Sequence, residues 1–193
     1  MENDDFKRIL DPKKSGLVVW DVQNMTVERI SNKKEFLENT NALIKTAHDC
    51  GIPVFFSKIT PLPERFESEA RKFFYKNRKL NMTPEGLELA IKPDGSDTVI
   101  SKNTASIFIG TNFELMVRNA GITTLVFTGI ATEIGVESSA RDALNRGIFP
   151  VIAEDAVSSG DKDAHERSLL NMRKMFIVLE TEEISRMLKI NYF

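Results

Sequence analysis

The sequence predicts an α/β protein built on an open, mostly parallel sheet of about six strands, with helices on both faces. Short apolar, β-branched runs recur along the chain, and segments whose apolar residues have helical spacing separate them. Near-continuous apolar runs of this length suit parallel strands that are covered on both faces. Alternating strands and helices favour right-handed crossovers, so we expect a three-layer, Rossmann-like arrangement.

Six segments carry the strand pattern, at residues 17–22, 53–59, 98–101, 124–128, 150–153 and 175–179. Helical spacing of apolar residues is found at 36–47, 113–117 and 136–144, shortly before Gly51, Gly121 and Gly147. Glycine after the last periodic residue is a common end of a helix. Residues 61–95 contain four prolines and interrupt the rhythm, and we interpret them as a partly helical excursion that covers the active-site edge.

Composition limits the function classes. A chain of 193 residues suits one domain, 1–193, and its formal net charge of −2 gives no electrostatic reason to expect nucleic acid or an acidic membrane as partner. The basic, aromatic run at 71–79 is interpreted as a solvated helix face. The sequence has no transmembrane-length apolar run and no signal-peptide pattern, and its one cysteine, Cys50, cannot form an internal disulfide. We therefore expect a cytoplasmic protein.

Ligands of open parallel sheets bind beyond the carboxyl ends of the strands, at a switch in strand order. This rule selects Asp21, Lys102 and the segment 129–135. Each has a structural alternative: Asp21 can cap the next loop, Lys102 can be a surface lysine, and 129–135 can be an ordinary turn with Thr132 as N-cap. The N–H groups of that turn can instead form a site for an anion or oxyanion.

Four sequence blocks carry a resemblance to a known family. They are LVVWDVQN at 17–24, KNTASIFIGT at 102–111, TGIATEIGVESSARDA at 128–143, and residues 147–156 with their terminal EDA. In this order and spacing they span most of the chain. They resemble the isochorismatase-like hydrolases, also called cysteine hydrolases, which include isochorismatases, nicotinamidases and carbamoyl-amide hydrolases.

The resemblance implies roles for particular residues. It makes Asp21 and Lys102 the catalytic acid/base pair that flanks a cysteine nucleophile, and it places a cis peptide bond at Ile130–Ala131. The backbone of Ile130, Ala131 and Thr132 would then bind an oxyanion or substrate. Gln23, two residues after Asp21, either orients Asp21 or a water, or finishes a turn.

This chain has Gly135 where the family carries its cysteine. Glycine has no nucleophile, so the thioester route is closed. Isochorismatases resemble this chain in lacking the cysteine and hydrolyse an enol ether without a covalent intermediate, but they place a tyrosine where Ala131 stands. We expect a hydrolase of a small metabolite, of the enol ether or amide class, that uses Asp21 and Lys102, and its substrate is left open.

Two alternatives stand beside this reading. A catalytically silent small-molecule-binding or assembly protein would acquire thiol reactivity through Gly135→Cys. A Cys50-dependent amidase is the other, although Cys50 fits a buried structural thiol.

Metal and cofactor sites are not expected. The resemblance to nicotinamidases implies two histidines after the second strand, but residues 60–66 contain none, and His48 and His165 fall on predicted helices elsewhere.

Three further residues have both a structural and a functional interpretation. Glu133 suits the first turn of a helix by its charge alone, or positions a water. Arg65 and Arg71 can bind a substrate carboxylate or lie on the surface. The apolar tail at 190–193 and the family suggest a homo-oligomer, a dimer or tetramer.

Overall fold

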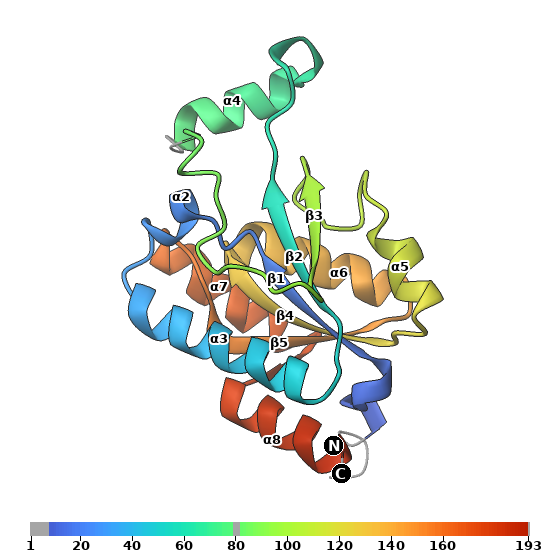
Figure 1. The fold of residues 1–193 in the computed structure, drawn as a ribbon. Coiled ribbons are helices and arrows are strands. Elements are labelled where there is room, and N and C mark those ends of the chain that lie inside the picture. Colours follow the sequence, from blue (N-terminus) through green and yellow to red (C-terminus); the bar gives the residue numbers. More distant parts are fainter. Residues whose placement is uncertain (1–7, 79–81, 193) are drawn as a thin grey trace.

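The computed structural model of the protein describes residues 8–78 and 82–192, whose six strands form one parallel sheet. The strands lie in the order β3-β2-β1-β4-β5-β6, and each pairing of neighbours is parallel (Figure 1). Their bounds are β1 Ser15–Trp20, β2 Val54–Ile59, β3 Thr98–Lys102, β4 Thr124–Ile130, β5 Phe149–Ser158 and β6 Ile177–Leu179. The predicted fold class is confirmed.

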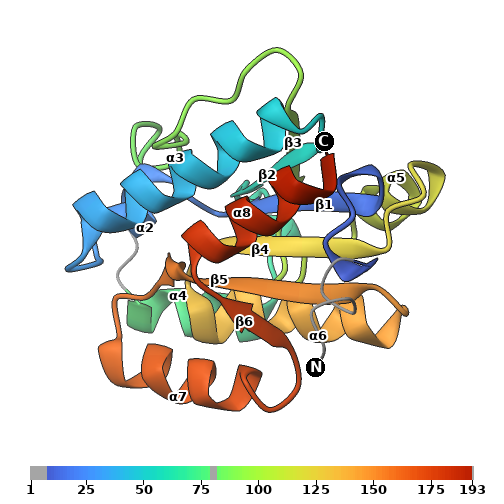
Figure 2. The same cartoon turned by 90° about the horizontal axis from the view of Figure 1, so that it is seen from below.

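Helices cover both faces of the sheet, which Figure 2 shows as three layers. One face is covered by α3 (Lys33–Asp49) and α8 (Thr181–Tyr192), and the other by α5 (Phe113–Asn119), α6 (Glu137–Asn145) and α7 (Lys162–Met172). The remaining helices are η1 (Pro12–Lys14), α2 (Asn24–Val27), η2 (Glu64–Phe66), α4 (Glu69–Arg78) and η3 (Thr132–Val136). Helix α8 was not among the predicted segments, although Ile184 and Leu188 are buried at the helical spacing of four residues.

The two central strands explain why the apolar runs are nearly continuous. All residues of β1 and β4 are buried, because each strand faces a helical layer on both sides. Successive side chains of β1 enter opposite cores: Leu17 and Val19 pack below α3 and α8, whereas Val18 and Trp20 pack with α5, α6 and α7. Trp20 therefore points toward the layer that contains η3 and α6.

Several strand boundaries differ from the prediction, and the ends of β1 and β5 have a clear physical reason. Strand β1 ends at Trp20 rather than residue 22, because Asp21 adopts φ 46°, outside the strand region. Strand β5 continues to Ser158 rather than ending at residue 153. Its extension contains two acids that have partners: Glu154 pairs with Arg173, and the Asp155 carboxylate accepts hydrogen bonds from Thr181. A strand predicted from hydrophobic residues alone ends before these two acids, because they interrupt the apolar run.

The excursion at residues 61–95 rises beyond the carboxyl ends of β2 and β3 as η2 and α4, and then returns along the sheet edge (Figure 1). Its returning part pairs with the segment that follows β1. The N–H of Asn24 donates to the Glu88 carbonyl, that of Met25 to Gly86, and that of Ala90 to Val22, each at 2.9 Å. This contact fixes the backbone next to Asp21.

The order of the strands reverses between β1 and β4. The chain runs outward from β1 through β2 to β3, and then crosses to β4 on the other side of β1. The carboxyl ends of β1 and β4 thus form the switch point at which open parallel sheets bind ligands.

None of the helices in the described part of the chain combines the length and apolar character needed to cross a bilayer.

A substitution at Gly129 in β4 tests how closely the backbones of β1 and β4 approach each other. It has φ +132° and lies opposite Trp20, and a Cβ there would come within 2.1 Å of the Trp20 carbonyl oxygen. We expect Gly129→Ala to lower the free energy of unfolding by about 3 kcal/mol or more. The matched control is Gly51→Ala, at φ +64° with open space around it, which should cost about 1–2 kcal/mol. Urea denaturation measures both, and equal losses would contradict this account of Gly129.

Candidate functional site

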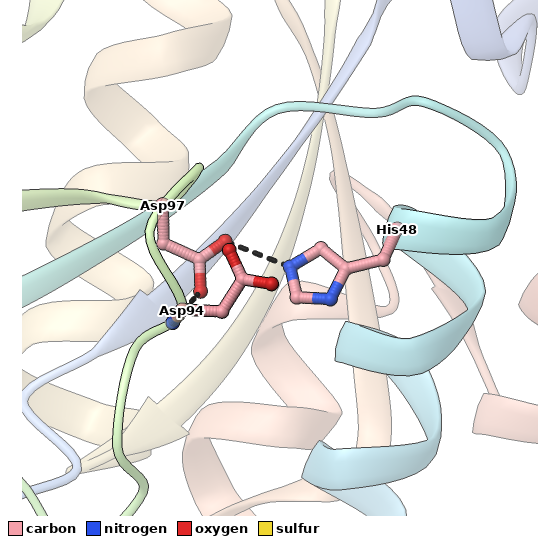
Figure 3. A group of neighbouring side chains, drawn as sticks. All are labelled: His48, Asp94 and Asp97. Atoms are coloured by element: carbon pink, nitrogen blue, oxygen red, sulfur yellow. Dashed lines mark hydrogen bonds and ion pairs between the residues drawn. The ribbon is translucent and has the colours of Figure 1, made fainter.

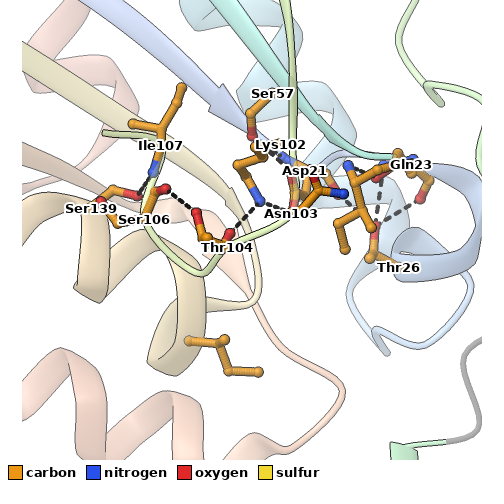
Figure 4. A network of polar contacts seen from close by, with 12 residues as sticks. Asp21, Gln23, Thr26, Ser57, Lys102, Asn103, Thr104, Ser106, Ile107 and Ser139 are labelled. Carbon is orange, nitrogen blue, oxygen red and sulfur yellow. Dashed lines mark hydrogen bonds and ion pairs between the residues drawn. The ribbon is translucent and has the colours of Figure 1, made fainter. Parts of the chain in front are cut away.

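Asp21 is held in a buried position by the neighbouring strand. It follows β1 directly, is fully buried, and adopts a left-handed backbone conformation that aspartate tolerates better than most residues. The Ser57 hydroxyl of β2 donates to Asp21 Oδ1 at 2.6 Å and accepts from the Asp21 N–H at 3.1 Å (Figure 4). Ser57 was not singled out from the sequence, where it is an ordinary strand residue. Its hydroxyl fixes the rotamer of the carboxylate.

Lys102 reaches Asp21 from the end of β3. Its Nζ lies 2.6 Å from Asp21 Oδ2 and 3.1 Å from the Thr104 carbonyl oxygen, and its side chain is 1% exposed. The alternative of a surface lysine is therefore wrong. The structure brings together the two charged residues that the strand-end rule selected 81 positions apart.

The loop after β3 supplies the second oxygen for this ammonium group. Within it, the Thr104 hydroxyl donates to the Ser106 carbonyl at 2.8 Å, and the Ile107 N–H donates to the Ser139 hydroxyl of α6 at 3.1 Å (Figure 4). The block KNTASIFIGT thus folds back as a loop tied to α6. The tie places the Thr104 carbonyl within reach of Lys102.

Trp20 completes the surroundings of the ammonium group. Lys102 Nζ lies 3.7 Å from the centroid of the Trp20 ring, close enough for a cation–π contact. A carboxylate, a carbonyl and an aromatic face therefore surround this charge. Trp20 had been interpreted only as part of a strand. The alternation of side chains along a strand could have identified it, because that alternation places Trp20 on the same face of the sheet as Val18, where α6 packs.

Burial shifts both ionisable groups toward their neutral forms. Loss of solvation raises the pKa of the Asp21 carboxyl, against the attraction of Lys102 and the hydrogen bonds from Lys102 and Ser57. Loss of solvation lowers the pKa of the Lys102 ammonium, against its attraction to Asp21, and the positive charge of Arg71 lowers it further. The two pKa values thereby shift toward each other, which favours proton transfer at this site.

The turn after β4 lies next to Trp20, whose ring also contacts Lys102. A cis peptide bond joins Ile130 and Ala131, at the position that the family resemblance implied. The Ala131 carbonyl then accepts hydrogen bonds from the N–H groups of Ile134, Gly135 and Val136 at 3.1–3.3 Å. Ala131 is therefore the N-cap of η3, and the alternative in which Thr132 caps this turn is wrong.

Thr132 has a different partner. Its buried hydroxyl lies 2.8 Å from His165 Nδ1 on α7, and burial lowers the pKa of that histidine. Nothing in the sequence pattern links His165 with the turn, because the contact exists only once α7 packs over η3. The histidine fixes the first residue of the π-helical turn.

Gly135 faces Trp20 directly. A Cβ built on Gly135 would lie 1.8 Å from Trp20 Cη2 and 1.9 Å from Cζ2. The indole thus fills the space that any side chain at position 135 would need. We therefore expect that Gly135→Cys by itself does not create a reactive thiol, because the sulfur would collide with Trp20.

Gln23 is engaged by backbone groups. Its amide oxygen accepts from the Ile59 N–H at 2.8 Å, and its amide nitrogen donates to the carbonyls of Leu87 at 2.7 Å and Ile59 at 3.2 Å. It ties the end of β2 to the returning part of the excursion. This matches the structural alternative for Gln23.

The other candidates also have protein partners. The Glu133 carboxylate accepts from the Ser159 hydroxyl at 3.1 Å, Arg71 pairs with Glu67 at 3.0 Å, and the Arg65 guanidinium lies 5.7 Å from the centre of the Phe66 ring.

A possible metal-ligand group lies away from this site. In the described part of the chain, ligand atoms of His48, Asp94 and Asp97 lie within 4.8 Å of one another (Figure 3). His48 Nε2 is 2.7 Å from Asp97 Oδ1, and the Asp94 carboxylate accepts from the N–H and hydroxyl of Ser96. Asp97 directly precedes β3, so the group is at the end of that strand opposite Lys102. These contacts explain it as a tie between α3 and the loop before β3.

Cys50 is also remote from Asp21. It is buried at the end of α3, shortly before β2 begins, and burial raises the pKa of its thiol. A thiol with a raised pKa is a poor nucleophile at neutral pH. The geometry gives no support to a Cys50-dependent amidase.

Comparisons with known proteins connect this geometry to one family. The family model for the isochorismatase domain matches residues 15–183. The chain is 30% identical to the ureidoacrylate amidohydrolase RutB of Methylobacterium radiotolerans over 196 aligned positions, covering 86% of this chain and 76% of the relative. A cysteine hydrolase from Pseudomonas syringae pv. phaseolicola has a similar fold, with TM-score 0.86, 19% identity, and 94% and 95% of the two chains covered. The nicotinamidase PncA of Bacillus subtilis has TM-score 0.71, 26% identity, and 86% and 99% coverage.

The buried pair predicts a pH-dependent stability. In Lys102→Met, Asp21 loses its cation, and we expect a loss of about 3–5 kcal/mol in the free energy of unfolding near neutral pH. The pKa of Asp21 in the folded protein is then raised further above its unfolded value. Its contribution to stability is present below the unfolded pKa and is lost as the pH rises through the folded pKa. Urea unfolding at pH 5 and pH 8 should therefore show the larger loss at pH 8.

The control removes both charges. Asp21→Asn/Lys102→Met should regain most of the stability and should lose the additional pH dependence, because no buried charge is left unpaired. A Lys102→Met variant as stable as the wild type at pH 8 would contradict the assignment of a buried, compensated pair.

Proposed function

Because the chain belongs to the isochorismatase family, we propose that it is a hydrolase of a small metabolite, of the enol ether or amide class, that forms no covalent intermediate. The supporting observation is the buried 2.6 Å contact between Lys102 Nζ and Asp21 Oδ2 beside the turn at Gly135. Asp21 moves the proton, Lys102 holds the carboxyl and adjusts its pKa, and the backbone of residues 130–132 binds the oxygen on which charge develops.

For an enol ether, Asp21 acts first in its protonated form. It gives its proton to the vinyl carbon, and the resulting oxocarbenium ion is captured by water. That water returns a proton to Asp21, and the hemiketal separates into an alcohol and a carbonyl compound. The raised pKa of Asp21 supports this role, since it increases the protonated fraction at a given pH.

For an amide, Asp21 acts first in its ionised form. It takes a proton from a water that attacks the carbonyl carbon, and the oxyanion is stabilised by the N–H groups of the turn. The proton then passes to the leaving nitrogen, which departs as an amine or ammonia. The same two side chains thus serve either substrate class, with opposite starting protonation of Asp21.

A second candidate function is a catalytically silent protein that binds a small molecule or acts in assembly. It is favoured by the completeness of the contacts around the pair: Lys102 has three partners, and Trp20 fills the space beside Gly135. Under this reading small acids bind without turnover.

Other sequence predictions belong to the same proposal. We expect one domain over 1–193, a cytoplasmic location, no metal or cofactor, and a homo-oligomer of two or four copies. Exposed apolar side chains on the excursion and near the carboxyl terminus support the oligomer: Phe66, Phe73, Ile190 and Tyr192. Phe193, part of the apolar tail, lies outside the described residues.

Asp21→Asn tests the proposal in a screen of enol ethers, amides and ureides. The variant should reduce any turnover by about 10²-fold or more, because it removes the group that carries the proton. Asp49→Asn is the matched control, since Asp49 is exposed and pairs with Lys45 one helical turn away. Product formation followed by mass spectrometry measures both. Turnover that persists in Asp21→Asn would refute the role of Asp21.

The pH profile of the wild type separates the two substrate classes. Enol ether hydrolysis needs protonated Asp21, so kcat/KM should fall as the pH rises through the raised pKa. Amide hydrolysis needs ionised Asp21, so kcat/KM should fall as the pH decreases through the same pKa. A profile that Asp21→Asn leaves unchanged in shape would assign the titration to another group.

A further inference from the structure

Trp20 forms one wall of the site in the place of a side chain at position 135. It is the single tryptophan of the chain and is 4% exposed. The six-membered part of its indole faces Gly135, with Cη2, Cζ2 and Cε2 at 1.8, 1.9 and 2.3 Å from the position of a Cβ there. Its ring face receives the Lys102 ammonium at 3.7 Å. Trp20 therefore contacts both the acid/base pair and the turn.

The indole nitrogen is a buried donor with no acceptor. Among the described residues, Trp20 Nε1 has no hydrogen-bond partner although the atom is shielded from solvent. Nε1 is bonded to Cε2, which is 2.3 Å from the position of a Cβ at Gly135, so the donor belongs to the part of the indole next to the turn. Tryptophan N–H groups usually find a partner when they are buried, and an unmet donor costs free energy. An oxygen of a ligand or of an ordered water would satisfy this donor.

We infer that Trp20 stands in for the missing nucleophile: its indole fills that volume, and its N–H binds a carbonyl or carboxylate oxygen of a small ligand. This inference rests on the proposed function, which it deepens. A donor without nucleophilic character holds the oxygen but forms no bond to carbon, so it favours attack by water. Because Trp20 and Lys102 are almost completely buried, only a small group of the ligand reaches this position.

A double-mutant cycle tests the exclusion of side chains at 135. Gly135→Cys alone should lower Tm by about 5 °C or more, because the new side chain collides with Trp20. Trp20→Val opens the space, so Trp20→Val/Gly135→Cys should be more stable than the sum of the two single changes predicts. Iodoacetamide labelling should then find one new reactive thiol only in the double variant, with Trp20→Val as the control for labelling of Cys50.

Two outcomes of the cycle would overturn the steric part of the inference. One is a Gly135→Cys variant with wild-type Tm and a readily labelled thiol. The other is strict additivity of the Tm shifts, which would mean that the two positions do not share space.

Nuclear magnetic resonance tests the donor directly, because a single tryptophan gives a single indole N–H signal. Acetamide and acetate serve as the smallest carriers of a carbonyl and a carboxylate oxygen. We expect one of them to move the indole signal downfield in a saturable manner. Gly135→Ala should abolish the shift, because a Cβ displaces the ring. An indole signal that neither probe moves would overturn the role of the donor.

Asp21→Asn separates this inference from the proposed function. The variant should retain the probe-dependent shift of the indole signal while it loses turnover. A shift in a protein that turns over no substrate would support the donor and refute the hydrolase. Turnover without any shift of the indole signal would support the hydrolase and refute the role of the donor.

Discussion

The buried pair of Asp21 and Lys102 determines which groups must surround it in the site. Each charge loses its hydration, and such a loss is compensated only by close partners with good geometry. Here the partners come from different elements: Ser57 from β2, the Thr104 carbonyl from the loop after β3, and the Trp20 ring from β1. The same loss of hydration brings the two pKa values together. Burial thus costs solvation energy and shifts both groups toward their neutral forms.

The parallel sheet makes this arrangement possible. Parallel strands end at the same edge, so the residues after β1, β3 and β4 meet even though the chain leaves the edge between them. Two sets of hydrogen bonds hold the loops at this edge of the sheet in position. The excursion returns to pair with the segment after β1 and receives the Gln23 amide, and the loop after β3 is tied to α6 through Ser139. The helices on either face supply the apolar cores that support all three strand ends.

Trp20 and the glycines opposite it form a second, steric unit. Gly129 allows β4 to approach β1 closely, and Gly135 leaves space for the indole. A large side chain on β1 and an absent side chain on η3 are therefore two parts of one packing solution. The result is an aromatic wall at the turn, in the space that a side chain at position 135 would need. The ionisable groups next to this wall are the Asp21 carboxyl and the Lys102 ammonium.

Local patterning in the sequence determined the alternation of strands and helices, the parallel sheet covered on both faces, and the positions of Asp21 and Lys102 at strand ends. These features follow from periodicity and from chain connectivity, which are readable in short windows. The tertiary structure alone decided that Ser57 holds Asp21, that His165 binds Thr132, and that Trp20 occupies the space beside Gly135. Each of these contacts joins residues more than thirty positions apart. Their direction and depth depend on how the layers pack, and no local pattern of the sequence specifies that packing.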